Sequence, residues 1–363
     1  MTTAYPIQDY ALLSDEECAV KIQAAKATLG KRCIVLGHHY QRDEVFQHAD
    51  ISGDSLKLSK EASESDAEYI VFCGVHFMAE VADILSRPEQ IAILPDLAAG
   101  CSMADMANKV NVQRCWDELA TVIDVENEVT PVTYINSAAD LKAFCGQHEG
   151  IVCTSSNAQK ILEWSFAKRE KILFFPDQHL GRNTAFKMGI PLEEMVVWNF
   201  NKPMGGLTAE QIRNAKMILW GGYCSVHQFF QPEQIDAFLE RYPETKVIAH
   251  PEACFEVCQK ADFIGSTEYI LKTVREAEAN TRWLVATELN LVNRLHEECQ
   301  AQGKNVHFMS PALSMCSTMF RTDPQHLAWI LENLAAGHVV NQISVAPEEA
   351  KFAKIALDNM LAL

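Results

Sequence analysis

Three cysteines in this chain have the residue type and the setting of metal ligands. Each lies in a loop of small residues just after an apolar, strand-like run, and the segments read AAGCSM around Cys101, GGYCSVH around Cys224 and SMCSTM around Cys316. They are 123 and 92 residues apart, so only the fold can bring them together. Three converging thiolates favour a metal centre with one open coordination position, because a closed structural site would recruit a fourth protein ligand. An open position indicates chemistry at the metal.

The strands and helices that must position these cysteines form a pattern that repeats three times in the sequence. Apolar, β-branched runs with polar tips alternate with segments of helical period, which is the pattern of βα units and parallel sheets. The three sets begin at Cys33, Pro131 and Lys246, and the middle set carries one extra unit. We therefore predict an α/β fold of three similar domains with short parallel sheets, related by pseudo-threefold symmetry around a central active site. The predicted domains span residues 1–128, 129–243 and 244–363, the last with a C-terminal helix, and each contributes one of the cysteines.

Polar side chains recur where the first strand of each set is expected to end. These side chains are His38, His39 and Tyr40 in the first set, Tyr134 and Asn136 in the second, and His250 and Glu252 in the third. Taken singly, each of these side chains is as readily a structural residue, hydrogen-bonded at a strand end, as a functional one. Their recurrence at equivalent positions, close to the cysteines, favours a shared site for proton transfer and hydrogen bonding.

Hydroxyl groups precede the next predicted helix in every set. They are Ser55 in the first set, Ser155 in the second, and Ser266 with Thr267 in the third. Such residues are good helix N-caps, and the same hydroxyl and backbone N–H groups can also bind a carboxylate or a phosphate. His227 lies three residues after Cys224, where it either points into the same cavity or caps a helix.

The composition argues against several classes of function. The 363 residues carry a formal charge of −17 with no cluster of Lys and Arg, which argues against a nucleic-acid surface. A small anionic substrate stays compatible with this charge, since backbone N–H groups at helix N-termini bind anions. The sequence shows neither a secretion signal nor a run of about 18 apolar residues. We therefore expect a cytoplasmic protein without a membrane span, whose twelve cysteines are reduced.

Two other classes of protein are compatible with some of these residues. Nine cysteines remain besides the three loop cysteines, and most lie in strands or in segments of helical period, as packing residues do. Cys254 and Cys258, an i, i+4 pair near His250, could bind zinc, so a zinc-dependent hydrolase that uses the His and Glu strand tips is an alternative. A non-catalytic sensor with a metal cluster is a second alternative, but it leaves the polar strand tips without a role.

The cysteines and strand tips together resemble those of the quinolinate synthase family, iron–sulfur enzymes of NAD biosynthesis. The resemblance extends from about Cys33 to Thr318 and rests on ten motifs in the same order: LGHHYQ, GDSLKLS, VTYINS, CTSSNA, FPDQHLG, GGYCSVH, HPEAC, GSTEYI, TELNLVNRL and SMCSTM. It implies a [4Fe–4S] cluster held by one cysteine from each domain, namely Cys101, Cys224 and Cys316, with the fourth iron open to substrate. Two features depart from the family pattern. Some relatives have several cysteines around the third ligand, whereas Cys316 is alone in its segment, and His39 occupies a position that varies in the family.

The activity that this resemblance implies is the condensation of iminoaspartate with dihydroxyacetone phosphate to quinolinate, with loss of phosphate and two waters. Iminoaspartate hydrolyses readily, so transient contact with an aspartate-oxidising enzyme is expected. The catalytic residues implied are Glu252 as the base, and Tyr40, His38 and His227 in proton transfer. The substrate-binding residues implied are His38, Ser55, Tyr134, Asn136, Ser155, His250, Glu252, Ser266 and Thr267.

Overall fold

The computed structural model describes residues 3–311 and 314–363, which contain three short sheets. All the strand pairs in these sheets are parallel, and helices connect and flank the strands. This confirms the predicted α/β class with three parallel sheets. By contacts the chain divides into two compact units: unit 1 comprises Met1–Cys101 and Met315–Ala346, and unit 2 comprises Ser102–Ser314 and Pro347–Leu363.

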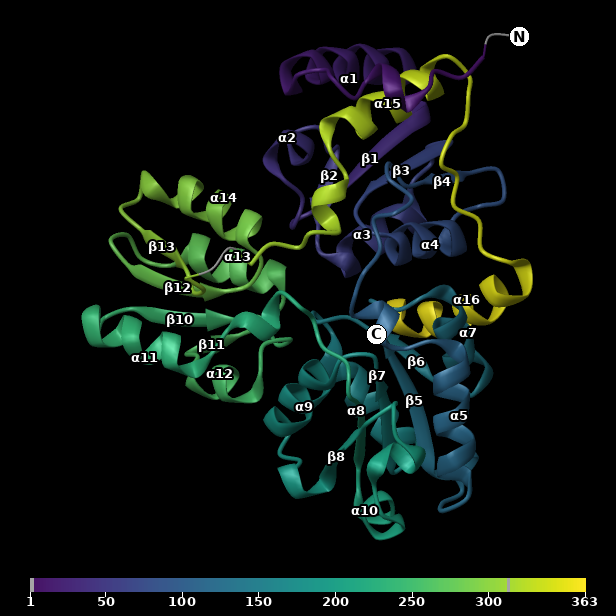
Figure 1. Cartoon of the computed structure of the whole chain (residues 1–363), viewed down its shortest axis with the longest axis vertical. Coiled ribbons are helices and arrows are strands. Elements are labelled where there is room, and N and C mark those ends of the chain that lie inside the picture. Colours follow the sequence, from purple (N-terminus) through teal and green to yellow (C-terminus); the bar gives the residue numbers. More distant parts are fainter. Residues whose placement is uncertain (1–2, 312–313) are drawn as a thin grey trace. The chain divides into compact units, whose positions relative to one another are not determined.

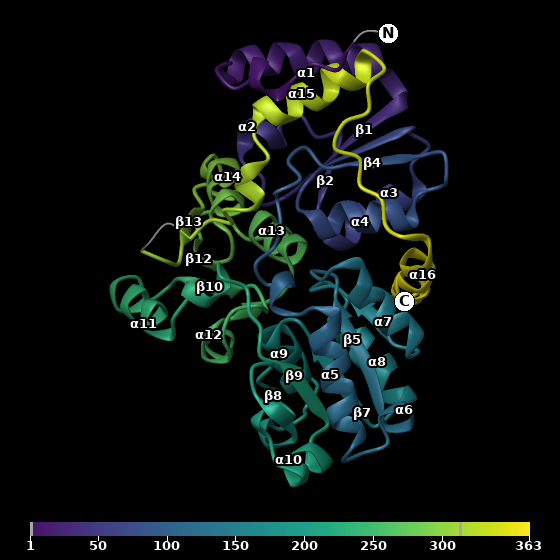
Figure 2. The ribbon, with the colours of Figure 1, turned by 45° about the vertical axis from the view of Figure 1, so that its right-hand side comes forward.

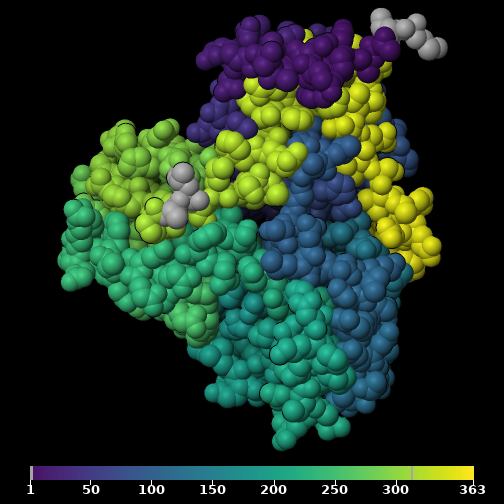
Figure 3. Space-filling model, viewed as in Figure 1, coloured from purple at the N-terminus to yellow at the C-terminus, as the bar shows by residue number. Residues whose placement is uncertain are grey.

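The first sheet belongs to unit 1 and has the strand order β2-β1-β3-β4. Its strands are β1 (Cys33–His38), β2 (Ile51–Gly53), β3 (Tyr69–Cys73) and β4 (Ile91–Ile93), and the helices of this unit are α1 (Asp15–Leu29), α2 (Asp43–Phe46), α3 (Ser55–Glu64), α4 (His76–Leu85) and α15 (Pro324–Ala335). Helices α1 and α15 come from opposite ends of the chain and lie side by side, purple against yellow-green (Figures 1, 2 and 3). Buried Ile22 of α1 and Leu331 of α15 share one apolar cluster with Val71 of β3, so the C-terminal segment completes the core of the first sheet.

The second sheet belongs to unit 2 and has the order β6-β5-β7-β9-β8. Its strands are β5 (Val129–Tyr134), β6 (Ile151–Cys153), β7 (Lys171–Phe175), β8 (Met195–Trp198) and β9 (Met217–Trp220), and its helices are α5 (Lys109–Ala120), α6 (Val125–Glu128), α7 (Ala139–Gln147), α8 (Ala158–Lys168), α9 (Gln178–Lys187), α10 (Ala209–Asn214) and α16 (Pro347–Leu361). The C-terminal helix α16 packs against α7 and β6 (Figure 1).

The third sheet also belongs to unit 2 and has the order β11-β10-β12-β13. Its strands are β10 (Lys246–Ala249), β11 (Phe263–Ile264), β12 (Arg282–Ala286) and β13 (Asn305–Phe308), and its helices are α11 (Pro232–Arg241), α12 (Phe255–Lys260), α13 (Thr267–Glu276) and α14 (Leu289–Gln300). Val247 and Leu284 of this sheet are buried with Val257 of α12, since a parallel sheet needs apolar residues on both covered faces.

The three sheets repeat one strand order. In each, the first strand in sequence lies second in the sheet, between the second and the third, and the middle sheet adds β8 at its far edge as the extra unit predicted from the sequence. Cys101, Cys224 and Cys316 follow β4, β9 and β13, which are equivalent strands in this order. The predicted domain boundaries after residues 128 and 243 stay predictions. Among the described helices, none is long and apolar enough to cross a membrane.

Candidate functional site

Glu252 lies at the centre of a buried group of polar side chains in unit 2. Its Oε1 accepts a hydrogen bond from the Tyr134 hydroxyl at 2.6 Å, and its Oε2 lies 2.9 Å from Nδ1 of His227. The rings of His227 and His250 are stacked with centroids 4.6 Å apart. Glu252 is 3% exposed and His227 is fully buried. Strand ends β5 and β10 supply Tyr134 and the His250–Glu252 segment, so two sheets of one unit deliver this group.

The electrostatics of this group favour an ionised carboxylate. Burial alone would raise the pKa of Glu252, but the imidazoles of His250 and His227 and the hydrogen bond from Tyr134 hold this pKa below its ordinary value. Burial lowers the pKa of His250 to about 3, and the negative charge of Glu252 opposes that shift. Glu252 is therefore a hydrogen-bond acceptor that stays available at neutral pH.

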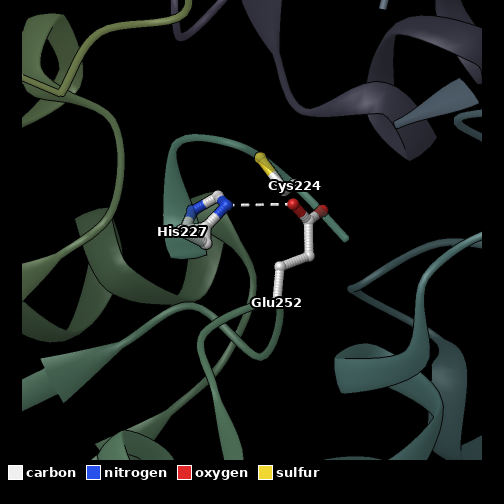
Figure 4. A group of neighbouring side chains, drawn as sticks. All are labelled: Cys224, His227 and Glu252. Carbon is white, nitrogen blue, oxygen red and sulfur yellow. Dashed lines mark ion pairs between the residues drawn. The ribbon is translucent and has the colours of Figure 1, made fainter. Parts of the chain in front are cut away.

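Cys224 lies beside this group and completes a set of atoms that could hold a metal ion. One ligand atom each from Cys224, His227 and Glu252 lies within 4.8 Å of the others (Figure 4). The short 3-10 helix His227–Phe229 begins three residues after Cys224, and the Gln228 amide donates to the Cys224 carbonyl at 3.0 Å. The loop geometry therefore turns the sulfur and the imidazole toward the same place.

Cys101 and Cys316 belong to unit 1, where one ion pair joins their two segments. Arg321 Nε lies 2.8 Å from a carboxylate oxygen of Asp96, which belongs to the loop that leads from β4 to Cys101. A 3-10 helix, Met319–Arg321, begins three residues after Cys316, as one begins after Cys224. Another, Ala104–Met106, begins three residues after Cys101. The same type of turn thus follows each of the three cysteines. Each cysteine is also followed directly by serine in the sequence.

Chain neighbours of Cys101 and Cys316 contact the Cys224 turn within unit 2. Ser102 directly follows Cys101, and its hydroxyl oxygen lies 3.4 Å from that of Ser225. Ser314 lies two residues before Cys316, and its hydroxyl donates to the Val226 carbonyl at 3.0 Å.

The nine other cysteines are poor candidates for metal ligands. Burial raises the pKa of every one of them, so each is held as a neutral thiol, whereas a metal ligand is a thiolate. The nine are Cys18, Cys33, Cys73, Cys115, Cys145, Cys153, Cys254, Cys258 and Cys299. The three loop cysteines, in contrast, are only partly buried. The donor chemistry of Cys101, Cys224 and Cys316 therefore fits a thiolate-bound cluster.

The zinc alternative finds no support at the pair that suggested it. Cys254 and Cys258 donate weakly to backbone carbonyls, Cys254 to Phe230 and Cys258 to His250 and Ala253. Among the described residues, neither belongs to a group of His, Cys and carboxylate ligands. Their contacts are those of packing residues.

The first-sheet candidates lie at one strand edge of unit 1. His38 ends β1, the Tyr40 amide donates to His38 Nδ1 at 3.1 Å, and the two rings meet edge to face at 4.8 Å between centroids. His38 pairs in register with Gly53, which lies two residues before Ser55 at the start of α3. The structure therefore brings His38, Tyr40 and Ser55 to the same end of the first sheet, as predicted for strand tips.

Two of the predicted hydroxyl residues line one cavity of unit 2. Ser155 and Ser266 both border a cavity of about 560 Å³, close to the starts of α8 and α13. Buried atoms of two further candidates, Asn136 Oδ1 and Thr267 Oγ1, have no hydrogen-bond partner among the described residues. Since buried polar atoms are normally paired, both atoms have the capacity to hydrogen-bond a polar ligand.

The sequence reasoning missed two buried residues that contact this site. Thr287 Oγ1 lies 3.3 Å from Nε2 of His227. Asp177 is fully buried at the N-terminus of α9, where it accepts from the Leu180 amide at 2.6 Å, and burial together with the charge of Glu252 raises its pKa well above the ordinary value. Asp177 lies in the motif FPDQHLG and Thr287 in TELNLVNRL, both quoted above. Each residue type is also common at a helix N-terminus, so the sequence alone did not show that either lies beside the site.

Comparisons with known proteins show the family of this chain. A family model described as "Quinolinate synthetase A protein" matches residues 20–362. The chain is 54% identical over 358 residues to "Quinolinate synthase" of Herpetosiphon aurantiacus, with 98% of this chain and 95% of that protein covered. It is 54% identical over 360 residues to "Quinolinate synthase" of Acidobacterium capsulatum, with 99% and 96% covered, and 49% identical over 359 residues to that of Geobacillus thermodenitrificans, with 98% and 96% covered. By coverage and identity together, the chain belongs to the quinolinate synthetase A family.

Proposed function

We propose that this chain condenses iminoaspartate with dihydroxyacetone phosphate to quinolinate, with release of phosphate and two waters. The observation that carries the proposal is the group of Cys224, His227 and Glu252 within 4.8 Å, in a chain whose relatives are quinolinate synthases. The cavity with Ser155 and Ser266 supports it, because hydroxyl and helix N-terminal N–H groups bind carboxylates and phosphates.

We propose Cys101, Cys224 and Cys316 as the ligands of a [4Fe–4S] cluster. Their side chains are partly accessible, whereas burial holds the nine other cysteines as neutral thiols, and each of the three is followed by serine and a 3-10 helix. When bound, the cluster supplies a Lewis acid through the iron that lacks a protein ligand. The nine other cysteines are free thiols, which also fits a reducing cytoplasm.

Glu252 is the proposed base that takes a proton from carbon during the isomerisation of a ketose-like intermediate. Its lowered pKa keeps it ionised before the reaction but also makes it a weaker base, because proton transfer is most efficient when the pKa of the base lies near the working pH. Tyr134 and His227 hold its two oxygens and thereby orient the lone pairs. His227, His38 and Tyr40 are the proposed groups that move protons to and from leaving hydroxyls.

The remaining candidates are proposed to bind the substrates. Asn136 and Thr267 offer buried atoms without partners among the described residues, and His250 packs on His227 beside Glu252. Ser55, Ser155 and Ser266 offer hydroxyls near helix starts. Because iminoaspartate hydrolyses readily in water, we also propose that an aspartate-oxidising enzyme delivers it in transient contact.

The experiment that tests this function is a quinolinate assay on anaerobically purified protein, together with iron and acid-labile sulfide analysis. Iminoaspartate generated in situ and dihydroxyacetone phosphate should give quinolinate, with about four iron and four sulfide per chain. Zinc without sulfide, together with hydrolytic activity, would instead favour the hydrolase alternative. A cluster of the expected composition without quinolinate formation would leave the sensor alternative.

A further inference from the structure

The backbone on both sides of Glu252 is held by one buried amide. Asn183 Nδ2 donates to the Pro251 carbonyl at 2.9 Å and to the Ala253 carbonyl at 2.9 Å. The same nitrogen lies 3.2 Å from the sulfur of Cys258. Asn183 is 6% exposed, so water does not compete effectively for these bonds. Two peptide carbonyls fixed on one donor group leave the intervening residue little freedom to rotate.

These bonds from Asn183 act on the backbone on either side of Glu252. Tyr134 and His227 hold the two carboxylate oxygens, and neither of them fixes the backbone. The backbone of this segment is also anchored by three amides: His250 N–H donates to Ala286 O at 3.0 Å, Ala253 N–H donates to His250 O at 3.0 Å, and Glu252 N–H donates to His250 Nδ1 at 3.4 Å. Asn183 adds the bonds that fix the carbonyls of the residues directly before and after Glu252.

Helix α9, which carries Asn183, is also attached to the Cys224 loop. The amide of Gln178, its first residue, donates to the Gly222 carbonyl at 3.0 Å, and Asp177 forms an isolated parallel bridge with Gly222. Gly222 lies two residues before Cys224. One short rigid element therefore holds the cysteine loop at its N-terminus and the Glu252 segment five residues further along.

We propose that Asn183 is a positioning residue for Glu252, and that through α9 it sets the place of this carboxylate relative to the Cys224 loop. The inference rests on the proposed role of Glu252 as the base. Asn183 also borders the cavity of Ser155 and Ser266, but in this scheme its amide nitrogen acts through the two carbonyls on either side of Glu252.

The test is Asn183→Ala, examined in the parent enzyme and in the Glu252→Gln background. In the parent, kcat should fall roughly 10- to 100-fold, since a misplaced base slows the chemistry, while KM changes less than about threefold. Iron and sulfide per chain should stay at the parental level. In the Glu252→Gln background the same substitution should cost less than about threefold, because there is no base left to position.

Asn333→Ala is the matched control. Asn333 is fully buried and ties backbone together in the same way, donating to the carbonyls of Tyr5 and Trp329 in unit 1. Its substitution should lower the thermal midpoint without changing kcat per cluster. If Asn183→Ala does not accumulate as folded protein, Asn183→Ser is measured in the same way.

Two results would overturn the inference. One is a kcat within about threefold of the parent in a folded, cluster-loaded Asn183 variant. The other is an equal loss in the parent and in the Glu252→Gln background, which would mean a general structural role. Failure of the proposed function has a different signature, because the parent would then make no quinolinate or Glu252→Gln would retain full turnover.

Discussion

Glu252 is held by side chains from three different elements, and this is the residue on which the proposed chemistry depends. Tyr134 comes from β5, His227 from the turn after β9, and Asn183 from α9. Tyr134 and His227 each hold one carboxylate oxygen, and Asn183 holds the backbone carbonyls on either side of Glu252. A base held so firmly loses little freedom when it reacts, which is how a preorganised site lowers a barrier.

Glu252→Gln removes the proposed base while it keeps the size of the side chain. We expect kcat to fall by about 10² to 10⁴, the range for loss of a general base, with iron and sulfide content unchanged. Steady-state assay of quinolinate and metal analysis of the same sample check this. Parental turnover in the variant would remove Glu252 from the mechanism.

Cys316→Ser tests the ligand assignment in the third cysteine segment. Serine is a poor ligand for iron–sulfur clusters, so the variant should lose most of its iron and sulfide. Cys258→Ser is the control and should retain both, because burial raises the pKa of Cys258 and keeps it a thiol. Retention of a full cluster in Cys316→Ser would contradict the assignment.

At the scale of elements, the recurring device is an equivalent strand followed by a cysteine turn. β4, β9 and β13 hold equivalent places in their sheets, and a 3-10 helix begins three residues after the cysteine that follows each of them. The loop after β9 is held at two points, since Trp220 Nε1 donates to Met106 O at 2.8 Å and the Tyr223 amide contacts Met106 sulfur at 3.4 Å. Met106 ends the turn that follows Cys101, so this residue links two cysteine turns within unit 2.

Gly222→Ala tests whether the loop that carries Cys224 must pass close to the backbone just after β7. A Cβ at Gly222 would lie 2.3 Å from the Pro176 carbonyl oxygen, so the loop must shift and carry Cys224 with it. We expect less than half of the parental iron and sulfide, and turnover reduced roughly tenfold or more.

The adjacent Gly221→Ala is the control for that loop. Its Cβ would lie 3.1 Å from the Trp198 carbonyl oxygen, a contact that a shift of a few tenths of an ångström relieves. Metal analysis and assay of both variants should separate them. Equal cluster content in the two would show that the close approach at Gly222 does not place the cysteine.

At the scale of the whole molecule, the charge of −17 opposes the approach of the anionic substrates that we propose. The cavity that contains Ser155 and Ser266 is also lined by two exposed lysines, Lys160 and Lys187, with Glu163 beside them. Two helix starts at the same cavity add partial positive charge. This cavity thus offers locally positive groups on a negative protein.

Lys187→Glu should weaken this local attraction. We expect kcat/KM to fall roughly two- to fivefold at low ionic strength, and the difference to shrink in about 0.5 M salt because salt screens exposed charges. Lys31→Glu, an exposed lysine of unit 1 that is not part of this cavity, changes the net charge equally and is the control. The same salt dependence in both variants would mean that only the total charge matters.

The sequence by itself determined the fold class, the threefold repeat of strand-helix units, the cysteine loops and the family. Those features are local, because alternating apolar runs report which faces are covered, and short motifs keep their order along the chain. The boundaries between domains and the roles of individual site residues stay predictions, since a strand tip looks the same whether or not it serves a site.

Only the tertiary structure decided which side chains meet. Tyr134 and Glu252 are 118 residues apart and share a hydrogen bond, and Asn183 reaches carbonyls 68 and 70 residues further along the chain. No periodicity encodes such pairs, because they depend on the course of loops and on how helices pack over neighbouring sheets. Asp177 and Asn183 read as ordinary residues of a helix start and a helix interior until α9 is seen against the Cys224 loop and the Glu252 segment.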